Sequence, residues 1–272
     1  MTSLLRRKAA AVFSPISILL LAVLAVGSTG CSTTVTPPAP KLPTPAWESA
    51  KLIEALKQRD TALRSVRALA RVDYAGPEGK HSFQEAVLVE RPDKLRLETL
   101  TFLGAILIVT ANDKEMIGYH PREGVFVRGP RSKENLRRYT QMPLELEEIT
   151  GLLVGLPPLA AGTSWTQEGA ALIFSANGRR DVVAFESSQL VPTKWERFTG
   201  DGKVELSAQF SDYISTPAGL FPSKIFFEAH LQKRKIEIRY QEPEINATIP
   251  SELFSQQKPP HVQELPIEAV GS

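Results

Sequence analysis

The chain has few of the residues that covalent chemistry requires. Its 272 residues include one cysteine and four histidines. The histidines (His81, His120, His230 and His261) are scattered, without the spacing typical of metal ligands. The sequence contains no Gly-x-Ser-x-Gly, His-Glu-x-x-His or glycine-rich phosphate-binding motif. We therefore expect no catalytic site, no bound metal and no cofactor.

An excess of basic residues is also absent. The chain has 32 Lys and Arg against 30 Asp and Glu, for a formal net charge of +2. Loss of Arg6, Arg7 and Lys8 with an N-terminal signal would leave 29 basic and 30 acidic residues. A balance of this kind argues against binding to nucleic acid.

The most apolar run, Ile16 to Val26, has only 11 residues. A membrane-spanning helix needs about 20 apolar residues, whereas the apolar part of a signal peptide has about 7–15. Small residues then lead to Cys31, which resembles the lipobox of bacterial lipoproteins, although Ser28 stands where leucine is usual. We expect a signal peptide over 1–30 and a lipid anchor at Cys31. The alternative is an ordinary secretory signal followed by an incidental cysteine.

The segment after the cysteine predicts attachment to a membrane through a tether. An acylated Cys31 would hold the chain on a bilayer, and Ser32 in the next position favours, by analogy, the outer membrane. Residues 31–46 contain five prolines together with several threonines, a composition typical of an extended tether. We expect one folded domain over 47–258 and a flexible tail over 259–272.

The body is predicted to be mainly β (α+β). Helical spacing extends from Trp47 to about Leu69, and two further helices are expected over 132–139 and 146–154. Most of the remainder alternates between apolar and charged residues, as in Lys94 to Thr99. Such strands form an antiparallel sheet with one wet and one apolar face. About ten or eleven consecutive strands would curl into a strongly curved, unclosed barrel.

Three expected helices, one before the strands and two in mid-chain, are available to cover the apolar face of the sheet. The sequence leaves open whether this arrangement packs solid or encloses an apolar cavity. For a cavity, the expected lining residues are Leu95, Leu97, Leu107, Val109, Leu152, Leu153, Val204, Leu206, Phe210, Ile225, Phe227, Ile236 and Ile238.

The stretch Phe102-Leu103-Gly104 interrupts the strand pattern. Apolar side chains stand here beside a glycine, where a turn is usually polar. One interpretation is buried core, and the other is an exposed apolar loop that contacts lipid.

Three stretches resemble proteins of one known superfamily. LRLETLTFLG (95–104) is similar to a LolB strand that ends in a Pro-Leu-Gly loop. QMPLELEEITGLLVGLPP (141–158) is similar to the LolB segment that runs from Met-Pro through a helix to Leu-Gly-Leu-Pro. Residues 246–254 resemble an ending shared by LolA-type lipid-carrying lipoproteins. With the order of elements, these stretches make the chain resemble the LolA/LolB superfamily, and LolB most closely.

The resemblance implies an unclosed barrel with a helical lid over an apolar cavity. LolB proteins accept acylated lipoproteins from the periplasmic carrier LolA and insert them into the outer membrane. Their insertion step needs a protruding loop with an exposed leucine, which corresponds to Leu103, so the implied insertion loop is Phe102, Leu103 and Gly104. Phe102 replaces the family's proline, and the body is longer than a typical LolB.

The implied protein is a monomeric acceptor of lipoprotein or lipid, anchored at the periplasmic face of the outer membrane of a Gram-negative bacterium. One alternative is a structural or interaction lipoprotein of the cell envelope with a filled core. A second is a carrier of a different lipid or of a glycolipid.

Overall fold

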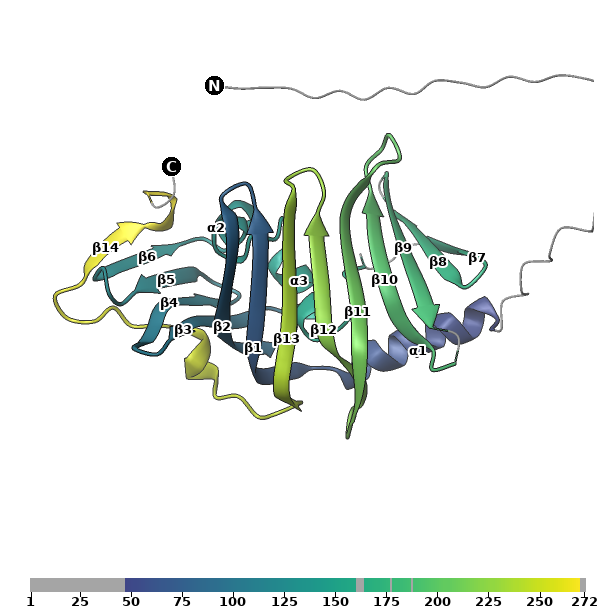
Figure 1. Cartoon of the computed structure of the whole chain (residues 1–272), viewed down its shortest axis with the longest axis horizontal. Coiled ribbons are helices and arrows are strands. Elements are labelled where there is room, and N and C mark those ends of the chain that lie inside the picture. The colour runs from purple at the N-terminus through teal and green to yellow at the C-terminus, as the bar shows by residue number, and fades with distance from the viewer. Residues whose placement is uncertain (1–46, 160–163, 177, 187, 270–272) are drawn as a thin grey trace, which may run out of the picture. The chain divides into compact units, whose positions relative to one another are not determined.

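The structure, a computed structural model, describes residues 47–159, 164–176, 178–186 and 188–269. The predicted signal peptide, Cys31 and the tether lie outside the described residues. The principal element is one 14-stranded sheet with the order β14-β6-β5-β4-β3-β2-β1-β13-β12-β11-β10-β9-β8-β7 (Figure 1). Neighbouring strands are antiparallel except that β14 runs parallel to β6.

The helices are α1 (Ser49–Ala62), α2 (Lys133–Thr140) and α3 (Leu146–Leu153), with short 3-10 turns η1 (Ser251–Phe254) and η2 (Ile267–Ala269). The strands are β1 (Ser65–Gly76), β2 (Gly79–Glu90), β3 (Lys94–Thr101), β4 (Gly104–Ala111), β5 (Met116–His120), β6 (Val125–Gly129), β7 (Ser164–Glu168), β8 (Ala171–Ala176), β9 (Arg179–Glu186), β10 (Val191–Phe198), β11 (Val204–Thr216), β12 (Gly219–Ala229), β13 (Arg234–Ile245) and β14 (Gln263–Pro266). Within the described part of the chain, no helix combines the length and apolarity needed to cross a bilayer.

The prediction of a mainly β fold with an unclosed, curved antiparallel sheet is confirmed. The sheet has more strands than the expected ten or eleven. One unpredicted strand is β7, whose sequence SWTQE is mostly exposed and lacks alternating apolar residues. It pairs with β8 at the edge of the sheet, so backbone pairing rather than burial defines it.

The first helix is shorter than predicted, because it ends at Ala62 and not near Leu69. From Ser65 the burial alternates with the period of a strand, so Val66, Ala68 and Ala70 point inward. Leu69 is consequently 44% exposed on the opposite face. Val66, which matches helical spacing, therefore belongs to a strand, where the period is 2.

The C-terminal tail was predicted to be flexible, but its described residues, up to Ala269, include the strand β14 and the turn η2. Strand β14 adds to the edge strand β6 by parallel pairing. Ile267 is fully buried against Gly129, where a Cβ atom would lie 2.2 Å from its side chain. One buried apolar residue and strand pairing thus fix a segment that is polar in composition.

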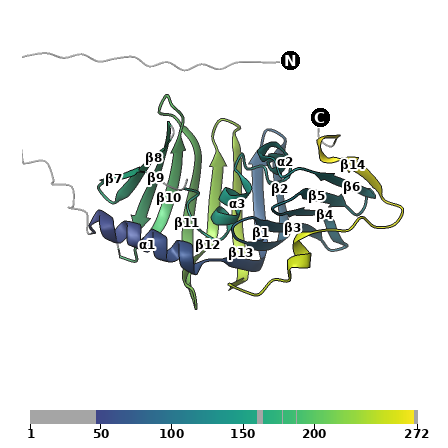
Figure 2. The same cartoon turned by 180° about the vertical axis from the view of Figure 1, so that it is seen from behind.

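The helices α2 and α3 lie in the connection between β6 and β7, two strands near opposite ends of the sheet. Figure 2 shows both helices in front of the same face of the sheet, α2 near β2 and α3 near the central strands. Most of α3 is buried, including Leu146, Ile149, Leu152 and Leu153. This arrangement is a helical lid over the apolar face.

The core differs between the two halves of the sheet. Strands β8 to β12 fill their half with buried aromatic side chains: Phe174, Phe185, Trp195, Phe210, Phe221 and Phe227. The helix α1 adds Leu52 and Leu56 to the same core, and Arg59 Nη1 donates to the carbonyl of Leu220 over 2.7 Å. The inward residues of β1 to β4 are mostly alanine, valine and leucine. Smaller side chains leave more room beneath the lid on this side.

Candidate functional site: an apolar pocket beside an exposed hairpin

A pocket of about 650 Å³ lies beneath the lid in the half built by β1 to β4. This volume falls within the range of about 300–1,000 Å³ typical of ligand pockets. The walls come from β1 to β4 and β13, and the lid contributes Tyr139 to Met142, Ile149 and Leu153. Most of the lining is aliphatic or aromatic, which suits an apolar ligand.

The pocket wall holds part of the predicted lining set, namely Leu97, Leu107, Val109, Leu153, Ile236 and Ile238. Each lies on a strand or helix that was expected to face a cavity. For the five residues on strands, the alternation that identified them is also the alternation that places them on one face of the sheet.

The remaining predicted residues do not line this pocket: Leu95, Leu152, Val204, Leu206, Phe210, Ile225 and Phe227. The five on β11 and β12 lie in the half that the aromatic side chains fill. Four of these are buried, and Val204 is half-buried. Leu95 and Leu152 are fully buried in the packed core. Alternation shows that a residue faces inward, but only the size of its neighbours decides whether space remains in front of it.

The rim of the pocket carries an exposed apolar hairpin tip. Thr101 lines the pocket, and the next two residues form the two-residue connection from β3 to β4. At this tip Phe102 is 95% exposed and Leu103 is 72% exposed. The stretch that interrupts the strand pattern is therefore exposed rather than buried core.

The tip is held in place by its own hydrogen bonds. Thr101 Oγ1 donates to the Gly104 carbonyl over 3.0 Å and accepts from the Leu103 amide over 3.3 Å. Gly104 has a φ of 103°, a backbone conformation that favours glycine. The exposed side chain of Arg122 donates to the same hydroxyl over 3.0 Å, so a cation lies next to the apolar pair.

The polar groups of the pocket were not predicted, and two of them are buried deeply enough to matter for a ligand: the carboxyl of Glu85 and the hydroxyl of Tyr139. Glu85 is only 8% exposed, and Oε1 accepts a 3.3 Å hydrogen bond from Thr99 Oγ1. Burial raises the pKa of Glu85 to about 7. The hydroxyl of Tyr139 is buried and has no hydrogen-bond partner among the described residues, and burial raises the pKa of Tyr139 to about 12. A glutamate at the inward position between Phe83 and Val87 was the available sequence signal.

A glycine of β5 permits the lid to pack down on the sheet. A Cβ atom on Gly118 would lie 2.9 Å from the ring of Tyr139 and 2.9 Å from a methyl group of Val127. Real side chains essentially never approach this closely, so the absence of a side chain at Gly118 sets how near α2 comes to the strands.

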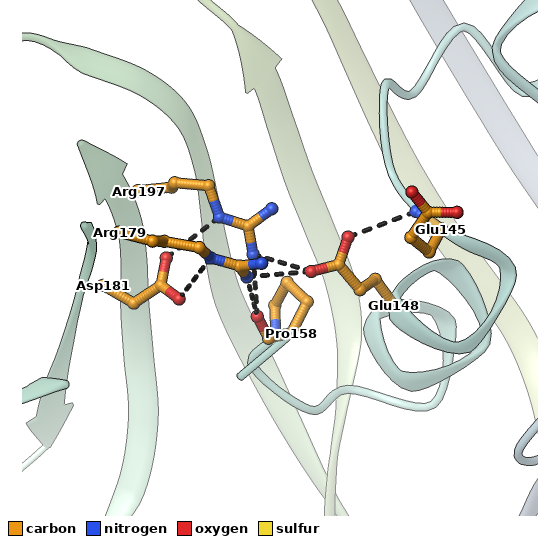
Figure 3. Close-up of polar contacts among 6 residues, drawn as sticks. All are labelled: Glu145, Glu148, Pro158, Arg179, Asp181 and Arg197. Carbon is orange, nitrogen blue, oxygen red and sulfur yellow. Dashed lines mark hydrogen bonds and ion pairs between the residues drawn. The ribbon is translucent and has the colours of Figure 1, made fainter. Parts of the chain in front are cut away.

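The other lid helix is fixed by a buried charge network (Figure 3). Glu148 Oε1 accepts from Arg179 Nη2 over 2.8 Å and from Arg197 Nη2 over 2.9 Å. Both arginines also pair with Asp181 and donate to the carbonyl of Pro158. Because Arg179 and Asp181 lie on β9 and Arg197 on β10, the network ties α3 to the aromatic half of the sheet.

A second set of contacts ties α3 to the pocket half. Thr150 Oγ1 donates to the carbonyl of Pro92, which lies between β2 and β3. The hydroxyl of Tyr240, on β13, donates to the carbonyl of Leu153 over 2.8 Å. The helix therefore connects strands on both sides of the sheet centre.

Comparison with solved structures shows that this is a LolA-like fold. The chain is similar to a structure described as an outer membrane lipoprotein-sorting protein domain from Vibrio parahaemolyticus (TM-score 0.54, 11% identity, 76% of this chain and 97% of that chain). It is also similar to a LolA superfamily protein from Nitrosomonas europaea (TM-score 0.52, 12% identity, 75% of this chain and 97% of that chain). A DUF1329 family protein from Desulfovibrio piger matches comparably (TM-score 0.55, 11% identity, 78% of this chain and 98% of that chain).

At these identities the similarity concerns the fold alone. No protein-family model matches the sequence, and no curated protein matches it.

Proposed function

We propose that this chain is a lipid-anchored acceptor of acylated lipoproteins, or of other lipids, at the periplasmic face of the outer membrane of a Gram-negative bacterium. A LolA-like carrier would deliver the cargo, and Cys31 would anchor the monomeric acceptor. The observation that carries the proposal is an apolar pocket whose rim bears the exposed Phe102 and Leu103.

The pocket supports the acyl-binding step. Removing apolar surface from water contributes about 25 cal/mol per Å², so an acyl chain would prefer this aliphatic lining to solvent. Leu97, Leu107 and Val109 form one wall, and Leu153 contributes from the lid. The step needs no covalent chemistry, and we assign the protein no catalytic activity.

The hairpin tip supports the transfer step. Burying a phenylalanine or leucine side chain contributes roughly 1.5–3 kcal/mol. Insertion of Phe102 and Leu103 into a bilayer would therefore stabilise the membrane-bound state of the tip. Arg122 beside them would meet anionic lipid headgroups. Direction would come from affinity, since the acceptor would bind acyl chains better than the carrier does and the bilayer would bind them better still.

The open pocket disfavours the alternative of an envelope protein with a filled core. Native mass spectrometry of protein extracted from membranes provides a test, since a lipid carrier should retain an acylated ligand that delipidation removes. Protein that carries no lipid beyond its own anchor would support the structural alternative. The mass of the ligand would distinguish a lipoprotein from a phospholipid or a glycolipid.

The transfer step is tested by Leu103→Glu in the full lipidated protein. We expect this variant to fold normally but to lose delivery of an acylated lipoprotein from a LolA-like carrier to vesicles. Leu231→Glu is the matched control, because Leu231 is also an exposed leucine (58%) but lies between β12 and β13. Normal delivery by Leu103→Glu, or equal loss in both variants, would remove the tip from the mechanism.

A further inference from the structure

The carboxyl group of Glu85 is the feature of the pocket that acyl binding alone does not explain. Its inward neighbours along β2 are Phe83 and Val87, and the residue that pairs with it on the adjacent strand β1 is Ala70. Within the described part of the chain, Thr99 Oγ1 donates the hydrogen bond that this carboxyl accepts, over 3.3 Å. An ionised carboxylate here depends on whatever water enters the pocket for the remainder of its solvation.

Filling the pocket changes that balance. An acyl chain displaces water from the lining but offers no hydrogen-bond donor to a carboxylate. The occupied pocket thus favours the neutral form of Glu85 more strongly than the empty pocket does. Binding and protonation then assist each other, because linkage between two ligands is reciprocal.

We propose that Glu85 determines the specificity of the pocket, which takes up an uncharged acyl chain together with a proton on this carboxyl and disfavours an acyl chain that ends in an anion. This inference rests on the proposed function, since it requires that the pocket binds acyl chains. It narrows the ligand class to acyl groups in ester or amide linkage.

Three other titratable groups lie near Glu85, on β3, on the lid and at the β1–β2 turn. On β3 the carboxylate of Glu98, paired with Arg96 over 2.6 Å, adds to the rise in the pKa of Glu85. Tyr139 on the lid stays neutral because burial raises its pKa to about 12. At the β1–β2 turn, hydrogen bonds from Tyr74 and Arg234 hold the pKa of Glu78 at about 2.

Tyr74 and His81 are the remaining titratable side chains on the described pocket wall. Burial raises the pKa of Tyr74, so this phenol stays neutral near pH 7. His81 is exposed at the rim. The variant His81→Gln therefore serves as a separate control for this side chain.

The test measures binding of two probes to the full chain between pH 5.5 and 8.5. One probe is a long-chain fatty acid methyl ester, and the other is an alkyl sulfonate of equal length. Neither probe titrates in this range, so any pH dependence belongs to the protein. For the wild type we expect ester affinity to fall about tenfold with rising pH, equivalent to about 1.4 kcal/mol, and sulfonate affinity to fall further.

Two variants test whether Glu85 causes the pH dependence of binding. Glu85→Gln keeps the shape of the side chain without its titration, and both pH dependences should flatten. Glu168→Gln is the charge-matched control, because Glu168 is exposed on β7 at the far edge of the sheet, and it should behave as the wild type. Calorimetry of ester binding in buffers of different ionisation enthalpy should show proton uptake near pH 7 in the wild type and none in Glu85→Gln.

The possible failures are distinguishable. Ester binding that is independent of pH in the wild type would overturn the inference and leave the proposed function standing. The inference would also be overturned, with the proposed function intact, if the dependence persists in Glu85→Gln and disappears in His81→Gln. No binding of either probe at any pH would overturn both.

Discussion

Replacing Glu148 by glutamine tests whether the charge network fixes the lid. A carboxylate accepts from Arg179 and Arg197 through Oε1, and from the Glu145 amide through Oε2 over 3.1 Å. Glutamine has a single carbonyl oxygen and no charge, so it cannot serve the arginines and the amide together. In the variant, the carboxylate of Asp181 alone remains to pair with the buried Arg197 and the half-buried Arg179.

The magnitude follows from the contacts. Each hydrogen bond to a charged group contributes about 1.5–3 kcal/mol, and a neutral replacement keeps roughly half of that. Arg179 retains 29% exposure of its side chain, which screens part of the remaining charge. We expect the free energy of unfolding to fall by about 2–3 kcal/mol in Glu148→Gln.

Urea denaturation at pH 7 measures this loss, and the m-value shows whether the unfolding transition remains cooperative. Glu147→Gln is a control on the adjacent residue, because Glu147 pairs with Arg131 over 2.6 Å at 48% exposure. Pairs at the surface contribute about 0–1 kcal/mol. Equal stability losses in the two variants would refute the view that the buried network anchors α3. Hydrogen exchange of the α3 amides should increase in Glu148→Gln alone.

Two further predictions concern the stability of the protein without ligand. Burial raises the pKa of Glu85 to about 7 from an ordinary value of 4.5, so the native chain retains a proton that the unfolded chain releases between these pH values. The free energy of unfolding of the wild type should therefore fall as pH rises through this window. Glu85→Gln should be more stable than the wild type by about 2–3 kcal/mol at pH 8 but not at pH 4.5. Equal differences at both pH values in chemical denaturation would contradict this. Gly118→Ala places a methyl group against Tyr139 and should destabilise by about 1–3 kcal/mol, as thermal unfolding would show. Gly200→Ala, where a Cβ atom meets nothing within 4 Å, should change stability little.

Much of the fold was predictable because it depends on local alternation. Strands such as β3 and β12 have one apolar face, which sequence periodicity reports directly. The errors lie where periodicity is ambiguous or absent. Val66 fits both helical and strand spacing, while β7 and β14 are defined by backbone pairing with a neighbour that sequence does not identify.

The candidate site was predictable only in part, for a physical reason. The inward positions of Leu97 and Phe227 follow from the same alternation, yet only Leu97 faces open space. The difference arises from aromatic neighbours contributed by distant strands. The exposure of Leu103 likewise depends on the two-residue hairpin, which pairs Thr101 with Gly104 and projects the tip beyond the other described residues.

The position of α3 makes the width of the pocket a long-range property. This helix is tied to Pro92 on one side and to Arg197 on the other, so it braces two halves of one sheet. A curved sheet that flattens must pull these attachments apart. Substitutions in the aromatic half, which touch no ligand, should therefore alter the affinity of a cavity on the opposite side. Natural variation in ligand preference would then arise from residues outside the pocket as well as from its lining.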